Sequence, residues 1–142
     1  MTPKSMKIRT KKGLNLKKFE NVQKLVDKAK RDDTILAVAF FGSYARGDAY
    51  HDVDVCLFLY PRHYSAAELS EKKLDYSLDN EKYDIQVFQQ LPLYIQIRIL
   101  HDAKFMFIRD EDVLYDVCFS TQREWEHFKP IYDSYLEAVE SG

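Results

Sequence analysis

The spacing of apolar positions changes along this chain, and each change predicts a different element. Residues 15–30 repeat apolar side chains at helical spacing, so we expect a helix with one apolar face. Residues 34–41 are a nearly unbroken apolar run, which is typical of a strand buried on both faces. Residues 52–60 predict a second strand, and Pro61 ends it because proline cannot donate a ladder hydrogen bond.

The second half of the chain continues this alternation of helices and strands. Ser65 and Glu68 fit a capping box at the start of a helix over residues 65–80. Residues 83–88 alternate between apolar and polar positions and predict a third strand. Three further segments are predicted: a helix over 91–101, a short strand over 104–108, and a long helix from residue 110 that Pro130 should kink or interrupt.

This order of elements predicts an α/β (α+β) fold, in which helices flank a small mixed sheet and a long helix ends the chain. Strands 52–60 and 83–88 are expected to lie side by side, so that acidic residues at their ends face one cleft. Residues 1–14 lack hydrophobic periodicity and are interpreted as a flexible basic arm. A single domain over residues 15–142 follows it, in keeping with the chain length.

Charge is distributed unevenly, although the net charge of the 142 residues is only −2. Residues 1–31 contain 11 of the 21 Lys and Arg but only two acidic residues, which gives this segment a charge of +9. The basic arm could contact RNA or an acidic partner, or it could be a solvated tail. Aromatic residues are not interleaved with its basic ones, so we favour the tail and expect no direct nucleic-acid binding.

Other compositional features indicate a cytoplasmic protein. No apolar run approaches the length of a membrane span, and the N-terminus lacks the apolar core of a signal peptide. Cys56 and Cys118 lie far apart without metal-ligand spacing. They are interpreted as small buried hydrophobic residues in a reducing compartment, with a disulfide left open as the alternative.

The candidate chemistry begins where the first strand ends. Gly42 and Ser43 can place backbone N–H groups at the start of a short helical turn, where they would face an anion. Asp52 and Asp54 are two residues apart, a spacing that puts both carboxylates on one face of a strand. Carboxylates and substrate phosphates together suit Mg²⁺. These residues therefore predict a site for a metal–nucleotide complex.

Asp84 and Arg46 extend this candidate site. Asp84 interrupts an apolar strand and could be a third metal ligand, or accept a proton from an attacking hydroxyl. It could equally be a polar residue on a half-exposed face. Arg46 could contact a phosphate or form a structural salt bridge. The absence of a Walker A lysine after Gly42 and Ser43 argues against a P-loop NTPase.

The segments Phe41–Gly47, Asp52–Val55 and Tyr83–Val87 resemble the minimal nucleotidyltransferases of the polymerase-β superfamily. More closely, the chain resembles the MNT antitoxins of prokaryotic HEPN–MNT toxin–antitoxin pairs. The loop between Ser43 and Asp52 is two residues shorter than is usual in that family. An alignment without a gap would instead pair Asp54 with Cys56, and we prefer the gapped alignment because a thiol is a poor Mg²⁺ ligand.

The resemblance implies a function. ATP would bind with its triphosphate at Gly42, Ser43 and Arg46, while Asp52, Asp54 and Asp84 would hold Mg²⁺ and catalyse transfer of AMP to a hydroxyl. In the antitoxin branch, the acceptor is a tyrosine of a cognate HEPN RNase toxin, and the two proteins form a hetero-oligomer. One alternative is a catalytically weak nucleotide-binding antitoxin that blocks its toxin by direct binding. Another is a transferase that acts on a small molecule.

Overall fold

A computed structural model describes residues 16–42 and 53–141, with side chains from Val22 onward in the first helix. Its elements, in chain order, are α1 (Leu16–Lys30), β1 (Ile35–Phe41), β2 (Val53–Leu59), α3 (Ala66–Asp79), β3 (Tyr83–Val87), the 3₁₀ turn η2 (Phe88–Gln90), α4 (Leu93–Asp102), β4 (Lys104–Ile108) and α5 (Glu111–Ser141). This α+β architecture agrees with the predicted fold class.

The four strands form one mixed sheet in the order β3-β2-β1-β4. β1 is antiparallel to both β2 and β4, whereas β2 and β3 are parallel. Because β1 and β2 are central, their side chains are buried on both faces, with the exception of Phe41 and Asp54 at the shared end of the two strands. The predicted burial of the first strand and the pairing of strands two and three are therefore confirmed.

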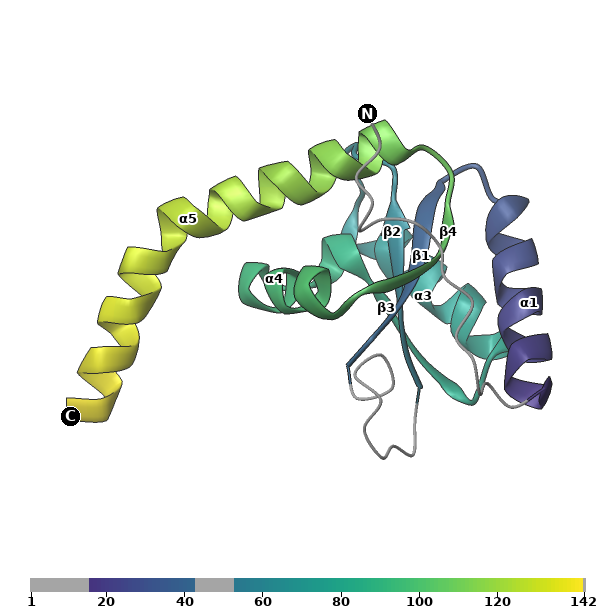
Figure 1. The fold of residues 1–142 in the computed structure, drawn as a ribbon, viewed down its shortest axis with the longest axis horizontal. Helices are drawn as coiled ribbons and strands as arrows, with labels where there is room; N and C mark the ends of the chain where they lie inside the picture. Colours follow the sequence, from purple (N-terminus) through teal and green to yellow (C-terminus); the bar gives the residue numbers. More distant parts are fainter. Residues whose placement is uncertain (1–15, 43–52, 142) are drawn as a thin grey trace.

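Helices cover both faces of the sheet, and each face has its own apolar cluster (Figure 1). Val53, Val55 and Leu57 of β2 pack toward α1 and α3. Cys56 and Phe58 face the other way and pack in the cluster that includes Ile99 of α4 and Leu114 of α5. The C-terminal part of α5 continues well past the sheet (Figure 1). None of the helices in the described ranges combines the length and apolar character that a membrane span requires.

Most predicted boundaries agree with the structure to within two residues, and the differences lie at local turns. Ser65 and Glu68 form the predicted capping box. The predicted strand over 83–88 ends one residue earlier, because Phe88 begins the turn η2. Helix α4 starts after Pro92, which serves as its N-cap. Of the two predicted effects of Pro130, a kink or an interruption, the interruption is absent, since α5 includes Pro130, and Figure 1 shows that this helix bends along its length.

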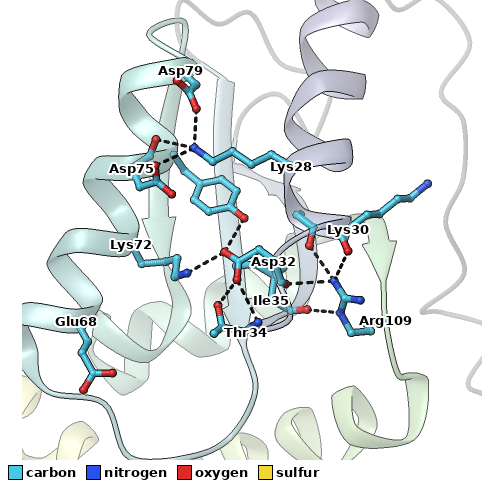
Figure 2. Close-up of polar contacts among 12 residues, drawn as sticks. Lys28, Lys30, Asp32, Thr34, Ile35, Glu68, Lys72, Asp75, Asp79 and Arg109 are labelled. Carbon is cyan, nitrogen blue, oxygen red and sulfur yellow. Dashed lines mark hydrogen bonds and ion pairs between the residues drawn. The ribbon is translucent and has the colours of Figure 1, made fainter.

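A polar network fixes the end of α1 against the sheet (Figure 2). The guanidinium of Arg109 donates hydrogen bonds to the carbonyls of Ile35, Ala29, Lys30 and Asp32, at 2.8 to 3.2 Å. Two of these carbonyls belong to the last turn of α1, where no intrahelical donor is available. Arg109 therefore joins the C-terminal end of α1 to the start of β1.

The Asp32 carboxylate lies at the centre of this network. It accepts hydrogen bonds from Lys72 Nζ at 2.8 Å, from Tyr76 Oη at 3.0 Å and from both donors of Thr34. Burial alone would raise the pKa of Asp32, but these hydrogen bonds outweigh it and hold the pKa below its usual value. Burial and the nearby Asp32 charge raise the pKa of Tyr76.

This lowered pKa predicts a pH-dependent contribution to stability. A carboxyl group with a lowered pKa in the folded state stabilises the fold above its unfolded pKa, and this contribution is lost as the pH falls through the folded value. The stability advantage of the wild type over Asp32→Asn should therefore be largest near neutral pH and shrink below pH 3.8, the ordinary value for this group. Urea titrations over this range would measure it, with Asp33→Asn as the control for loss of one exposed charge. An advantage that does not change with pH would contradict the prediction.

Candidate active site

Two of the predicted acidic residues are paired across neighbouring strands. In the parallel ladder between β2 and β3, Asp54 and Asp84 are direct register partners. Adjacent strands lie about 4.8 Å apart, and register partners point to the same face of a sheet. Asp54 is half-buried and Asp84 is exposed. The sheet therefore presents two neighbouring carboxylates on one face.

The face on which they lie is the one covered by α4 and α5. Side chains alternate along β2, so Asp54 shares its face with Cys56 and Phe58, which pack in the cluster with Ile99 and Leu114. The neighbours Val53 and Val55 point to the opposite face. The predicted alternation on β3 is confirmed: Tyr83, Ile85 and Val87 are buried, whereas Asp84 is exposed.

Gly42 closes one side of the acidic pair. It follows β1 with φ of +73°, a left-handed conformation that residues with a side chain rarely adopt. An added Cβ at this position would overlap Asp54 Oδ2 and lie 3.3 Å from Asp54 Cγ. Only glycine therefore leaves room for the Asp54 carboxylate in this position. The positive φ and the nearby Asp54 carboxylate are the reasons that glycine is required at position 42.

Replacing Gly42 with alanine is expected to destabilise the domain by about 1–2 kcal/mol, because strain from the positive φ adds to displacement of the Asp54 carboxylate. Chemical denaturation would measure this change in the free energy of unfolding. An unchanged transition midpoint would show that the turn at Gly42 adapts without cost.

Gln86 is a contact of the site that sequence reasoning did not single out. Its Nε2 donates to Asp84 Oδ1 at 3.1 Å, and its Oε1 accepts from Lys73 Nζ at 3.4 Å. The spacing between Asp84 and Gln86 could have indicated this contact, because residues two apart on a strand share a face. Gln86 therefore orients the Asp84 carboxylate from within the same strand.

The remaining predicted site residues, Ser43, Arg46 and Asp52, lie outside the described residues. Asp52 immediately precedes β2 in the chain. In the ranges 16–42 and 53–141, no group of three His, Cys, Asp or Glu side chains is arranged to hold a metal ion. The two described carboxylates nevertheless suit a hard cation such as Mg²⁺, since carboxylate oxygens are its usual protein ligands.

Cys56 does not fit the role that the ungapped alignment would assign to it. It is completely buried, and burial raises the pKa of its thiol, so the neutral thiol is favoured. A neutral buried thiol is not a magnesium ligand. Cys118, the second cysteine, is also a free thiol. The register of β2 and β3 thus supports the gapped alignment, in which Asp54 is the second acid of the pair.

The sequence of this chain is similar to known proteins. The family model described as "Polymerase beta, Nucleotidyltransferase" matches residues 23–112. A Methanocaldococcus jannaschii protein, "Putative protein adenylyltransferase MJ1547", is 35% identical over 75 residues, which are 51% of this chain and 56% of that protein. The matched segment is thus little more than half of the relative's length.

Two solved structures have similar folds. A chain of a toxin–antitoxin crystal structure with AMP-PNP has a TM-score of 0.64 at 14% identity, covering 83% of this chain and 98% of its own. A chain of the complex between tri-AMPylated Shewanella oneidensis HEPN toxin and MNT antitoxin has a TM-score of 0.64 at 14% identity, covering 86% and 98%. At this identity, the likeness establishes the fold.

Proposed function

Because this chain belongs to the polymerase beta nucleotidyltransferase family, we propose that it transfers AMP from ATP to a hydroxyl group. The observation that carries the proposal is the register pairing of Asp54 with Asp84 on one face of the sheet, beside Gly42. Two carboxylates at this separation can hold one divalent cation against a phosphate chain. The name of the M. jannaschii relative supports AMP as the transferred group.

The two acids have different surroundings, which suggests different roles. Asp54 is half-buried against Gly42 and is suited to a fixed ligand position. Asp84 is exposed and oriented by Gln86, so an incoming acceptor can reach it. Asp52, which precedes β2, would complete the ligand set. Mg²⁺, when bound, would neutralise charge on the triphosphate and on the α-phosphate oxygens during the reaction.

The proposed chemical step is a nucleotidyl transfer. The acceptor oxygen forms a bond to the α-phosphorus, and the bond between that phosphorus and the oxygen bridging to the β-phosphate breaks. Pyrophosphate leaves with the electron pair of the broken bond. The proton of the acceptor hydroxyl passes to the Asp84 carboxylate and from there to solvent. Gly42 and Ser43, with Arg46, would hold the triphosphate through backbone N–H groups and a guanidinium.

We further propose that the acceptor is a tyrosine of a cognate HEPN-type toxin and that the chain acts as its antitoxin in the cytoplasm. The two similar structures described above are of toxin–antitoxin complexes, which supports this context. The alternative role, neutralisation by direct binding, is favoured by the exposed aromatic side chains on α5, such as Phe119 and Tyr135. Exposed aromatic residues are typical of protein interfaces.

The experiment that separates the two roles combines the purified chain, Mg²⁺, ATP labelled at the α-phosphate and the HEPN-type toxin proposed as its partner. Transfer predicts label on the toxin and loss of its RNase activity. Direct binding predicts neutralisation that survives Asp54→Asn and leaves the toxin unlabelled. ATP labelled at the γ-phosphate is the matched control, because that label leaves with pyrophosphate. Label transferred from the γ-phosphate would contradict nucleotidyl transfer.

A further inference from the structure

α5 carries an apolar seam that extends beyond the body of the domain. Uncharged residues recur along it at alternating steps of four and three: Leu114, Cys118, Thr121, Trp125, Phe128, Tyr132, Tyr135 and Val139. Leu114 and Thr121 are buried, whereas Tyr135 and Val139 are 63% and 59% exposed. A mean spacing of 3.5 residues is the pattern by which one helix packs along another. The seam that the domain covers at one end therefore lies open at the other.

The open part of the seam forms one wall of a groove, which we call the distal groove. Leu93 and Tyr94 of α4 and Phe128, Ile131, Tyr132 and Tyr135 of α5 line it, with a volume of about 520 Å³. The rings of Tyr94 and Tyr132 stack at 6.0 Å and join the two helices. Ile131 is 66% exposed. An apolar groove between two helices is a common site for a third amphipathic helix.

The charge on the distal half of α5, which forms one wall of the distal groove, indicates the kind of helix the groove would accept. From residue 122 to the end of α5 there are five acidic and two basic side chains. Lys129 is already paired with Asp133 at 2.9 Å, so the remaining charge is mainly negative. A second copy of this chain would bring the same negative charge to the interface and be repelled. A partner helix with basic flanks would be attracted.

The distal groove is also on the same side of the sheet as the acidic pair. α4 and α5 cover the face that carries Cys56 and Phe58, which is the face of Asp54 and Asp84. A protein held along these helices would therefore approach the sheet from the side on which the carboxylates lie. A protein bound on the opposite face, over α1 and α3, would be on the side of the sheet away from the carboxylates.

We propose that the distal groove docks an amphipathic helix of a partner protein, with an apolar seam and basic flanks. The identity of this partner rests on the proposed function: it is the protein whose hydroxyl receives AMP. Docking would then deliver that hydroxyl to Asp54 and Asp84. The docking itself does not depend on the transfer reaction.

Two synthetic helical peptides of roughly 20 residues test the docking with the full-length protein. Both carry leucine at alternating steps of three and four; one has lysine flanks and the other glutamate flanks. Fluorescence anisotropy should give at least about tenfold tighter binding for the lysine peptide, and added salt should reduce that preference. Ile131→Glu and Tyr135→Glu should each weaken binding by about tenfold or more. Leu78→Glu is the matched control, because Leu78 is 68% exposed on α3, across the sheet.

Three results would overturn the proposal: equal affinity for the two peptides, no binding of either, or unchanged binding by Ile131→Glu and Tyr135→Glu. Light scattering provides a further check against self-association. We expect a mass of 16.8 kDa, that of one chain. A species of twice this mass that Ile131→Glu dissociates would assign the groove to a second copy. Asp54→Asn should leave peptide binding unchanged, so a failure of the transfer reaction would be recognised separately.

Discussion

Replacing Asp54 with asparagine is expected to lower the rate of AMP transfer by about 10²- to 10³-fold, the range observed when a group that stabilises developing charge is removed. The amide has nearly the same size as the carboxylate, so the fit beside Gly42 is kept while the negative charge is lost. The steady-state rate of label transfer from ATP labelled at the α-phosphate measures this effect. Circular dichroism and the thermal midpoint should stay close to those of the wild type.

The matched control for this substitution is Glu81→Gln. Glu81 is exposed and precedes β3, the strand that pairs with β2, by two residues, so the control removes one carboxylate near the site without changing the acidic pair. Its transfer rate should remain within about twofold of the wild type, since exposed charges contribute little at this distance. Asp54→Asn with wild-type activity would show that this carboxylate has no part in the reaction.

Replacing Phe40 with aspartate is expected to have the largest effect on stability. Phe40 is 2% exposed on the central strand β1 and packs in the cluster beneath α1 and α3. Its ring lies 6.4 Å from that of Tyr83, so the change also removes an aromatic contact. An uncompensated buried carboxylate costs several kcal/mol, which is a large fraction of the stability of a typical domain. The variant should unfold at much lower urea concentration or fail to fold.

Phe119→Asp is the control for this change, because it makes the same substitution at a side chain that is 52% exposed on α5. Its free energy of unfolding should change by less than about 1 kcal/mol. If the Phe40→Asp protein has the same free energy of unfolding as the Phe119→Asp protein, the buried position of β1 is contradicted.

The strands could be predicted because buried strands consist mainly of apolar residues. β1 and β2 are continuous apolar runs, as central strands covered on both faces must be. β3 alternates because it is at the edge of the sheet, where one face carries Asp84 and Gln86. The same alternation predicted that Asp84 points away from the buried face, which is the part of the site that the structure describes most clearly.

Other features depend on contacts that a local pattern does not contain. Arg109 binds carbonyls that lie 74 to 80 positions earlier in the chain, and only the folded arrangement of α1 and β1 brings them together. Pro130 was expected to kink or interrupt the last helix. The interruption is absent, because α5 continues through Pro130, while the helix bends along its length (Figure 1).

In the site, too, some features follow from the local sequence pattern and others depend on the folded structure. The position of Asp54 within its strand and that of Asp84 in an otherwise apolar strand were sufficient to predict the face on which each side chain lies, because strand periodicity fixes that face. Their direct register could not be derived, since a shift of two residues along β3 would keep the same face and separate the carboxylates. The need for glycine at position 42 also follows from the backbone angle, which sequence does not specify.

The most direct test of the account is a double-mutant cycle on the transfer rate, with Asp54→Asn, Asp84→Asn and the double variant. Two residues that act as one unit have strongly non-additive effects. If Asp54 and Asp84 hold one metal–nucleotide complex, the double variant should be no slower than about the slower single variant. Independent, multiplying losses would contradict a shared site, as would an Asp84→Asn protein that transfers AMP at the wild-type rate.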